Sequence, residues 1–281
     1  MKPYVKKNYH KRSIYYSNPN LFKRQSTIDP ILSKICHNFD LPRCALNINA
    51  SSKLVVYGDI VLKTKSENGL AITETIFRTG LDISLSSIDC SAQFVLVVEK
   101  DTIFQKLLNE SFYEKFKPCL LVTAKGYPDL MSRKFLAQLN HVYPNIPMLG
   151  LFDADPHGIN VFCTYKYGTM NPTMQDAEGT PVRIPNLRLC GLLPSELSSL
   201  QIKETELLPL TNNDKSLLET MRKRTYVQQE WELSKQVCNV KYFLSAEKKA
   251  ELESLNSIST RFLTDEYLPT KLELWGILPN K

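Results

Sequence analysis

The segment that begins near residue 92 alternates short apolar runs with amphipathic stretches, and this alternation restricts the possible folds more than any other feature. Three runs are continuously apolar, as in strands buried on both faces, and they lie in 93–100 (QFVLVVEK), 118–126 (PCLLVTAKG) and 146–155 (IPMLGLFDAD). The stretches 101–116 and 129–143 have helical periodicity, and another helix is expected after residues 156–158. This order predicts an α/β fold with a parallel sheet flanked by helices, followed from about Leu197 by a largely helical remainder.

Acidic residues end two of these predicted strands. Glu99 ends FVLVVE, and Asp153 and Asp155 end GLFDAD. Because parallel strands bring their carboxyl ends to one edge, and residues two apart on a strand point the same way, the three carboxylates could face one another. They would repel one another unless a cation held them, and Mg²⁺ suits such hard oxygen ligands. The alternative is that the aspartates only form a turn and cap the next helix.

The N-terminal segment has a different pattern. Residues 18–39 predict a helix with Asn18 as its cap, Pro19 in its first turn and a break at Pro30. Two strand-like pieces with alternating apolar residues follow at 45–50 (ALNINA) and 53–63 (KLVVYGDIVLK). A helix followed by a β-ribbon in a basic segment fits the back half of a winged-helix module, which is a DNA-binding shape.

Positive charge is concentrated at the start of the chain. The first 28 residues contain no Asp or Glu and seven basic residues, namely Lys2, Lys6, Lys7, Lys11, Arg12, Lys23 and Arg24. Such a block indicates either a polyanion as partner or a solvated arm.

The seven cysteines are spread along the chain, with no two close in sequence. This spacing excludes a CxxC zinc site and argues against a secreted disulfide scaffold, so buried thiols in a reducing compartment are expected. The longest apolar run, 94–98, is too short to span a bilayer, and no P-loop or GxSxG motif is present. The sequence therefore predicts a soluble intracellular protein.

Several stretches together resemble one family. The stretches LVVEKDTIF, AKGYPDLMSRKFL, LFDADPHGINVFCTYKYGT, RLCGLLPSEL and KKAELESL resemble the Toprim core of the topoisomerase VI A chain. The opening from KRSIYYSNPNLFKRQ to KLVVYG resembles that family's catalytic winged-helix segment, and the sequence of its first part is more similar to the eukaryotic meiotic branch. The resemblance implies a partial winged-helix (CAP-like) domain at 1–75 and a Toprim domain with a helical C-terminal part at 76–281.

The resemblance also assigns roles to individual residues. In the family the second of two adjacent tyrosines is the nucleophile, which makes Tyr16 the nucleophile here. Tyr15 would then be its packing neighbour, on the opposite face of a strand. Without the resemblance, the pair would be read as two ordinary strand residues. Arg12 would steady the scissile phosphate, and Lys53, Lys125 and Tyr127 would contact DNA.

This sequence departs from the family pattern at three places. Ser13 replaces an aspartate, Leu54 replaces the glycine after the lysine that matches Lys53, and the region before Tyr15 is shorter than in the family. The first substitution removes a carboxylate contact, and the second puts the role of Lys53 in question.

The resemblance implies an activity and an assembly. The expected enzyme is an Mg²⁺-dependent DNA transesterase that starts meiotic recombination with double-strand breaks, forming a 5′-phosphotyrosyl link. Two alternatives remain: a Toprim nuclease that uses metal-bound water, and a non-catalytic DNA-binding relative. Expected partners are double-stranded DNA, a second copy of the chain, a protein like the topoisomerase VI B chain and meiotic accessory proteins. The expected location is the nucleus, with no membrane association.

Overall fold

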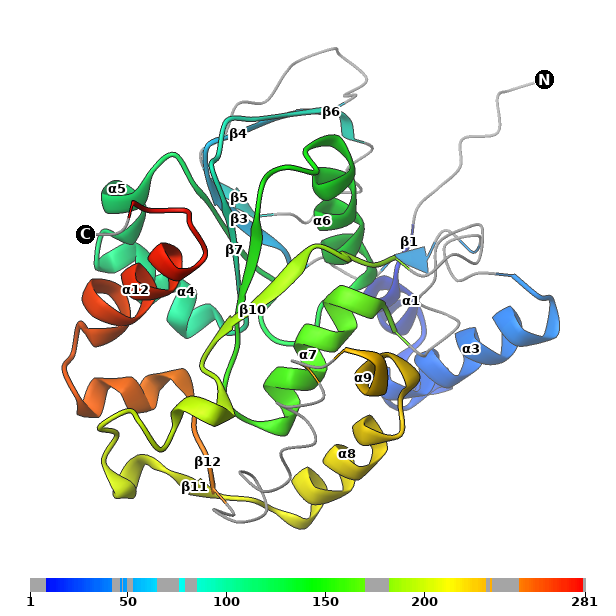
Figure 1. Cartoon of the computed structure of the whole chain (residues 1–281). Coiled ribbons are helices and arrows are strands. Elements are labelled where there is room, and N and C mark those ends of the chain that lie inside the picture. Colours follow the sequence, from blue (N-terminus) through cyan, green and yellow to red (C-terminus); the bar gives the residue numbers. More distant parts are fainter. Residues whose placement is uncertain are drawn as a thin grey trace.

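A six-stranded sheet forms the centre of this computed structural model (Figure 1). Its strand order is β10-β9-β7-β8-β3-β5, and the bounds are β3 Val55–Gly58, β5 Ile76–Arg78, β7 Val95–Val98, β8 Leu120–Thr123, β9 Met148–Leu151 and β10 Leu187–Gly191. Strands β10, β9, β7 and β8 are parallel, whereas β3 is antiparallel to β8 and β5. The structure describes residues 9–41, 46, 48–49, 53–64, 76–78, 85–169, 182–230, 233 and 248–279. The predicted parallel core is confirmed.

The connections between the parallel strands are helical, as the periodicity predicts. Their helices are α4 Asp101–Asn109, α5 Phe112–Phe116, α6 Leu130–Val142 and α7 Pro156–Tyr167. The stretch 101–116 forms two helices rather than one, because Ser111 takes a left-handed conformation with φ 60° between α4 and α5.

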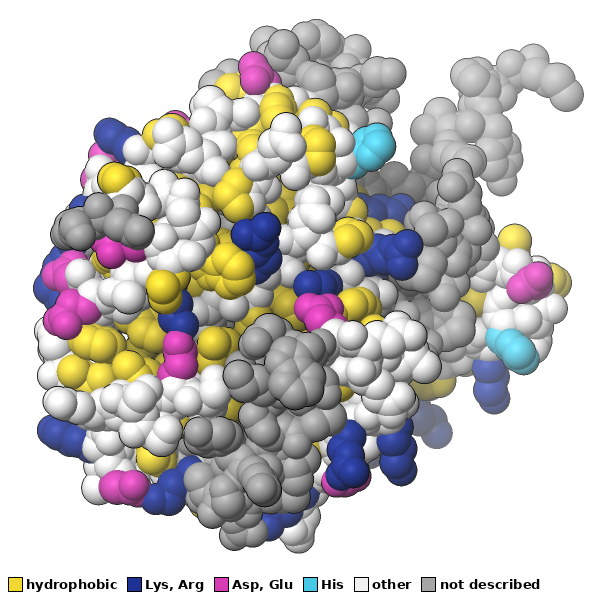
Figure 2. All heavy atoms as spheres, in the orientation of Figure 1, with side chains coloured by type: hydrophobic (Ala, Val, Ile, Leu, Met, Phe, Trp, Pro, Cys, Tyr) yellow, Lys and Arg dark blue, Asp and Glu magenta, His cyan; other side chains and the backbone are white. Residues whose placement is uncertain are grey.

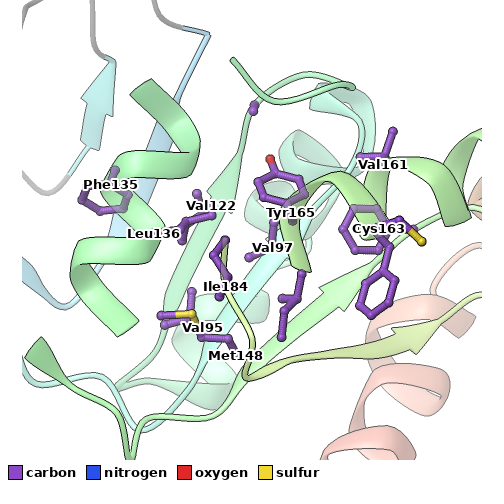
Figure 3. Close-up of a cluster of buried hydrophobic side chains, with 14 of the residues drawn as sticks. Val95, Val97, Val122, Phe135, Leu136, Met148, Val161, Cys163, Tyr165 and Ile184 are labelled. Carbon is purple, nitrogen blue, oxygen red and sulfur yellow. The ribbon is translucent and has the colours of Figure 1, made fainter. Parts of the chain in front are cut away.

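The sheet separates two apolar layers, because successive residues of a strand point to opposite faces. Val95 and Val97 of β7 pack with side chains of α6 and α7, together with those of the C-terminal helices α8 Asn212–Arg222 and α9 Thr225–Gln229. Figure 3 shows part of this layer, including Leu136, Tyr165 and Ile184. Leu96 and Val98 pack on the other side with α4, α5 and the C-terminal helix α12 Leu268–Leu274. The buried strands therefore lie between helices on both faces (Figure 1).

Residues 9–41, the described start of the chain, contain three short helices, α1 Lys11–Ser17, α2 Pro19–Phe22 and α3 Ile28–Asn38, with a 3₁₀ turn at Gln25–Thr27. Asn18 caps α2 as predicted, since its Oδ1 accepts a hydrogen bond of 3.3 Å from the Leu21 N–H. The break predicted at Pro30 is wrong. It lies at Lys23, whose φ is 57°, and Pro30 sits in the first turn of α3, where a missing N–H costs nothing.

The expectation that Tyr15 and Tyr16 alternate across a strand is also wrong, because both lie in α1. Adjacent side chains of a helix are about 100° apart rather than opposite. The two rings form an edge-on contact, with centroids 5.2 Å apart.

The predicted β-ribbon of residues 45–63 is rearranged. Strand β2 Ile48–Asn49 pairs with β1 Tyr9–His10, and residues 53–63 divide into β3 and β4 Ile60–Thr64, which pairs with β6 Leu85–Cys90. Strand β3 joins the main sheet because Val55 and Val56 are buried on its two faces. The domain boundary proposed at residues 75 and 76 stays a prediction, although β3, which precedes it, pairs with β8.

A glycine makes the division of residues 53–63 possible. Gly58 has a φ of 127°, and a Cβ atom there would collide with the carbonyl oxygen of Cys119. Only glycine therefore fits the turn between β3 and β4.

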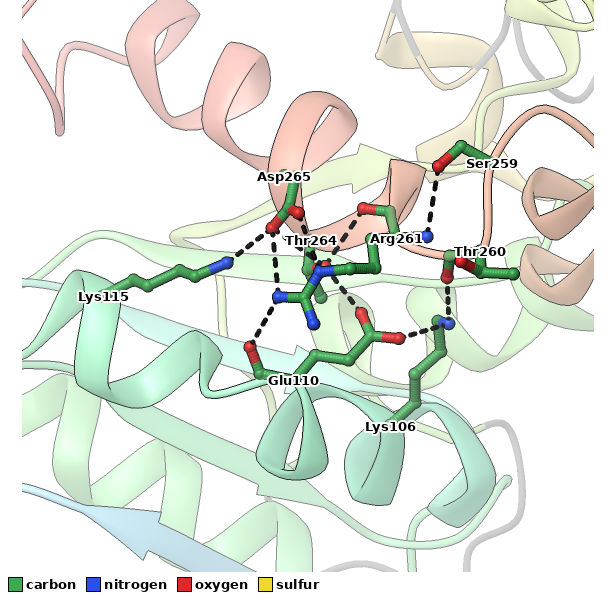
Figure 4. A network of polar contacts seen from close by, with 8 residues as sticks. All are labelled: Lys106, Glu110, Lys115, Ser259, Thr260, Arg261, Thr264 and Asp265. Atoms are coloured by element: carbon green, nitrogen blue, oxygen red, sulfur yellow. Dashed lines mark hydrogen bonds and ion pairs between the residues drawn. The ribbon is translucent and has the colours of Figure 1, made fainter.

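A polar network attaches the C-terminal region to α4 and α5 (Figure 4). Lys106 Nζ contacts both Glu110 Oε1 and the carbonyl oxygen of Thr260, each at 2.6 Å. Asp265 pairs with Lys115 at 2.5 Å and with Arg261 at 2.8 Å, and these contacts hold its pKa far below the usual range. The same region contains a short strand pair, β11 Leu208–Pro209 with β12 Lys248–Lys249. The C-terminal region thus packs against the central sheet rather than extending from it.

The expected burial of the cysteines is confirmed for the described residues, where Cys36, Cys90, Cys119, Cys163 and Cys190 are buried free thiols, and the reducing compartment stays a prediction. Cys44 and Cys238 lie outside the described residues. Within the described part of the chain, every helix is too short or too polar to cross a bilayer.

Candidate functional site

Two of the three predicted acidic residues meet at one edge of the sheet. Glu99 directly follows β7, and Asp153 lies two residues after the neighbouring strand β9. The Asp153 N–H donates a hydrogen bond of 3.0 Å to Glu99 Oε2. The two residues are 8% and 3% exposed. The topology therefore brings these carboxylates together, and their role as metal ligands stays a prediction.

Burial changes the protonation of this pair. Burial, together with the charges of Asp153 and Asp155, raises the pKa of Glu99 to about 8. Burial also raises the pKa of Asp153 to about 6, although Lys100 and the Leu252 N–H act against the increase. Two buried carboxyl groups that influence each other's charge need positive charge nearby to ionise together, and a bound cation would supply it.

A lysine already lies at this position. Lys100 Nζ is 2.8 Å from Asp153 Oδ2 and 3.2 Å from both Glu251 Oε2 and Glu253 Oε2. Burial lowers the pKa of Lys100, but the attraction of Asp153 outweighs this and leaves the pKa raised. Sequence reasoning missed Lys100 and its two glutamate partners, although both segments belong to the stretches that resemble the Toprim core.

The alternative for Asp153 and Asp155 was that they only form a turn and cap the next helix, and Asp155 does cap that helix. Its Oδ1 accepts a hydrogen bond of 2.6 Å from the Gly158 N–H at the start of α7. Gly158 is required there, because a Cβ atom would collide with the carbonyl oxygen of Asp153. Among the described residues, no three Asp, Glu, His or Cys side chains are gathered closely enough to hold a metal ion. The donor chemistry of Glu99 and Asp153 nevertheless fits a hard divalent cation, with Asp155 two residues away.

The residues proposed to contact DNA gather near one loop. Lys125 Nζ is 3.1 Å from Asp101 Oδ2, and the Lys125 side chain is 45% exposed. Tyr127 follows two residues later and is 43% exposed. Lys53 is exposed and attached to the same loop, since its backbone N–H donates a 2.7 Å hydrogen bond to Asp129 Oδ2.

Tyr127 belongs to a hydrogen-bonded group that sequence reasoning missed. Its hydroxyl accepts a 2.8 Å hydrogen bond from Asn160 Nδ2, and the Arg224 guanidinium donates one of 2.7 Å to Asn160 Oδ1. His157 Nδ1 lies 3.3 Å from the Tyr127 hydroxyl. Burial raises the pKa of Tyr127, and the charges of Glu99 and Asp155 contribute. The tyrosine therefore stays a neutral phenol beside the acidic pair.

The described residues on the face in Figure 2 form no single basic patch. Lys and Arg side chains are scattered there among acidic and apolar ones. A DNA interface formed by the described residues of this face would therefore depend on individual side chains rather than on a continuous basic surface.

The proposed nucleophile lies in the N-terminal helices. Tyr16 is 67% exposed on α1, whereas Tyr15 is half-buried. Among the described residues, the Tyr16 hydroxyl has no hydrogen-bond partner. Arg12 lies in the same helix one turn earlier, and its side chain lies outside the described part.

Comparison with known proteins agrees with these features. Residues 94–272 match the Toprim domain family described for the A chain of topoisomerase 6 and Spo11, and residues 6–48 match the family described as Type IIB DNA topoisomerase. Toprim domains generally bind a divalent metal ion.

Individual relatives are similar over nearly the whole chain. Meiotic recombination protein SPO11 of Homo sapiens is 34% identical over 273 residues, which is 95% of this chain and 66% of the human protein. The Mus musculus protein of the same name is also 34% identical, with the same coverage. The A chain of DNA topoisomerase 6 from Arabidopsis thaliana is 30% identical over 94% of this chain and 60% of its own length. The chain thus spans 66% of the length of the two mammalian relatives, and it belongs to the family formed by Spo11 and the topoisomerase 6 A chain.

Proposed function

We propose that this chain is a DNA-cleaving transesterase that starts meiotic recombination by forming double-strand breaks. The observation that carries the proposal is Tyr16, which stands exposed on α1 within the segment that matches the type IIB topoisomerase family. The same chain holds a buried carboxylate pair at the strand ends of its Toprim domain. The names of the SPO11 relatives supply the meiotic context.

The proposed reaction exchanges one phosphodiester for another. The Tyr16 phenolic oxygen attacks the phosphorus and loses its proton as the new P–O bond forms. The bond between phosphorus and the 3′ oxygen breaks, and that oxygen takes up a proton to leave as a free 3′-hydroxyl. The attacking phenolic oxygen needs its developing charge offset, and Arg12 is the nearest basic residue along α1.

The carboxylates are proposed to hold Mg²⁺. Glu99 and Asp153 would be its ligands, with Asp155 as the third, and the bound ion would supply positive charge beside the DNA phosphates. Lys53, Lys125 and Tyr127 would position the duplex by contacts to its backbone.

A double-strand break requires two nucleophiles, and each chain offers one. The proposed active form is therefore a dimer with a two-fold axis that matches the duplex, acting in the nucleus. Tyr16 of one copy would meet Glu99, Asp153 and Asp155 of the other. A protein like the topoisomerase VI B chain, together with meiotic accessory proteins, would complete the assembly. The exposed, unpartnered hydroxyl of Tyr16 supports this arrangement, because the described residues of its own chain do not engage it.

The experiment that tests this function is the trapping of a covalent protein–DNA adduct. The full chain is incubated with its partner proteins, Mg²⁺ and end-labelled duplex DNA, and then denatured before electrophoresis. The expected product is labelled DNA attached to the chain through its 5′ end. Metal-dependent cleavage without an adduct would instead indicate a nuclease that uses water, and DNA binding without cleavage would indicate a non-catalytic relative.

A further inference from the structure

The candidate metal centre already contains a positive charge of its own. We propose that Lys100 is the resident counter-ion of this centre, and that a divalent cation displaces its ammonium group from Asp153 onto Glu251 and Glu253. The inference rests on the proposed metal centre and adds a residue that sets how tightly the centre holds its ion.

The first observation is that both oxygens of Asp153 are engaged by the protein. Oδ1 accepts a 2.8 Å hydrogen bond from the Leu252 N–H, and Oδ2 is 2.8 Å from Lys100 Nζ. Asp153 is 3% exposed, so these contacts replace water almost completely. A divalent cation that bound Asp153 would have Lys100 beside it, and two like charges at such a distance repel each other strongly.

The second observation is that Lys100 has two further acidic partners besides Asp153. Glu251 Oε2 and Glu253 Oε2 each lie 3.2 Å from its ammonium nitrogen, on the side of the C-terminal segment. The Thr102 hydroxyl donates a 3.0 Å hydrogen bond to Glu253 Oε1 and holds that side chain in position. A small rotation of the flexible lysine would therefore move its charge away from Asp153 without leaving it unpaired.

The third observation is that the receiving segment is fixed to the strand end. The Ala250 N–H donates a 3.1 Å hydrogen bond to the carbonyl oxygen of Ala154, and Leu252 is bound to Asp153 as described. Glu251 and Glu253 flank Leu252, so their distance from Asp153 is set by backbone contacts rather than by loose side chains. Because the backbone holds both glutamates near Asp153, they form a fixed second binding position for the Lys100 ammonium group, unlike a chance ion pair on the surface.

The arrangement predicts opposite effects for the two halves of the ion-pair cluster. Removing the lysine charge removes the competitor, so the metal should bind more tightly. Removing the two glutamates takes away the second position, so the lysine should stay on Asp153 and the metal should bind more weakly. A lysine that only fastened the C-terminal segment to α4 would weaken binding in both cases.

The test measures Mn²⁺ binding to the full chain by electron paramagnetic resonance, without DNA and at about pH 8.5, where protonation of the carboxyl groups limits binding least. The variants are Lys100→Gln, the double substitution Glu251→Gln with Glu253→Gln, and the triple combination. Lys106→Gln is the matched control, because Lys106 is a similarly shielded lysine of α4, 20% exposed against 27%, whose partner is Glu110.

Lys100→Gln should bind Mn²⁺ tighter by on the order of tenfold, the effect of one charge a few ångströms from a divalent ion even in a watery environment. The double variant should bind more weakly than the wild type. The triple variant should match Lys100→Gln, since the glutamates act only through the lysine, and Lys106→Gln should match the wild type.

Equal or weaker Mn²⁺ binding by Lys100→Gln overturns the proposal, as does a triple variant that keeps the weakness of the double variant. If Lys100→Gln does not fold, the double variant decides, because its glutamates are 49% and 36% exposed. Unchanged or tighter Mn²⁺ binding by the double variant then overturns the proposal. The metal centre itself is checked separately by Asp153→Asn, which should abolish Mn²⁺ binding. Loss of binding in Asp153→Asn, with no effect of Lys100→Gln, would leave the proposed function standing and refute the counter-ion role.

Discussion

The backbone N–H of Asp153 donates its hydrogen bond to Glu99 Oε2 across the adjacent ends of β9 and β7, at 3.0 Å. One acidic side chain therefore positions the backbone that carries the other. The carboxylate of Glu99 has two separable properties, its charge and its capacity to accept a hydrogen bond.

Substitutions at Glu99 should separate these two properties. Glu99→Gln keeps an acceptor for the Asp153 N–H and should fold normally, but it should lose Mg²⁺-dependent DNA binding because the charge is gone. Glu99→Ala also leaves a buried N–H unpaired and should lower the free energy of unfolding by about 1–3 kcal/mol. Urea unfolding and DNA titration with and without Mg²⁺ measure both effects. Metal-dependent DNA binding that survives in Glu99→Gln and in Asp153→Asn would place the metal elsewhere.

The stability of the metal-free chain should depend on pH through this pair. Burial raises the pKa of Glu99 to about 8 and that of Asp153 to about 6, whereas unfolded carboxyl groups titrate near 4. The folded chain thus holds protons that the unfolded chain releases, so stability should fall as pH rises from about 4 to about 8 and then level off. Urea unfolding in the presence of a chelator should show a flatter decline between about pH 6 and pH 8 for Glu99→Gln. An equal slope in both proteins would contradict the assignment.

The two tyrosines provide a matched pair. Tyr16→Phe should abolish the covalent adduct while leaving DNA affinity within about twofold, because phosphate contacts dominate binding. Tyr15→Phe should retain adduct formation, since its ring packs edge-on against that of Tyr16 and is half-buried. Denaturing gels and filter binding give the two readouts. An adduct that persists in Tyr16→Phe and disappears in Tyr15→Phe would exchange the two roles.

Mixing two inactive variants tests the shared site. Tyr16→Phe keeps its carboxylates and Asp153→Asn keeps its nucleophile, so a heterodimer has one complete site if the site forms between copies. With all partner proteins present, the mixture should regain single-strand nicking that neither variant shows alone. Heterodimers demonstrated by differential tags, but without nicking, would mean that each copy carries a complete site.

The salt dependence of DNA binding tests the loop at residues 125–129. Lys125→Gln should lower the slope of log K against log salt by about one unit, the contribution of one phosphate contact. Lys117→Gln is the control, because Lys117 is 54% exposed and lies before β8, at the opposite end of the strand that Lys125 follows. Equal slopes for the two variants would remove Lys125 from the interface.

The parallel core and the meeting of its acidic ends can be predicted from local patterns in the sequence. A strand such as 95–98 can be recognised in the sequence, because burial on both faces leaves it without polar residues. The helix at 130–142 can be recognised in the same way, because its apolar residues recur with the helical period. Once the strands are known to be parallel, the topology requires that Glu99 and Asp153 share an edge. The Asn18 cap and the burial of the described cysteines also follow from local chemistry.

The segments that join that core could not be predicted, because their pairing depends on contacts between distant parts of the chain. Alternation in residues 53–63 predicts a strand but does not name its partner, and β3 entered the sheet through pairing of Val55 with Thr123. The pattern around Tyr15 and Tyr16 fits a strand as well as a helix, and the helix formed. Lys100 gained its partners from Glu251 and Glu253, about 150 residues along the chain. Periodicity records which side of an element is buried, whereas such contacts depend on how distant elements pack, and no local pattern carries that information.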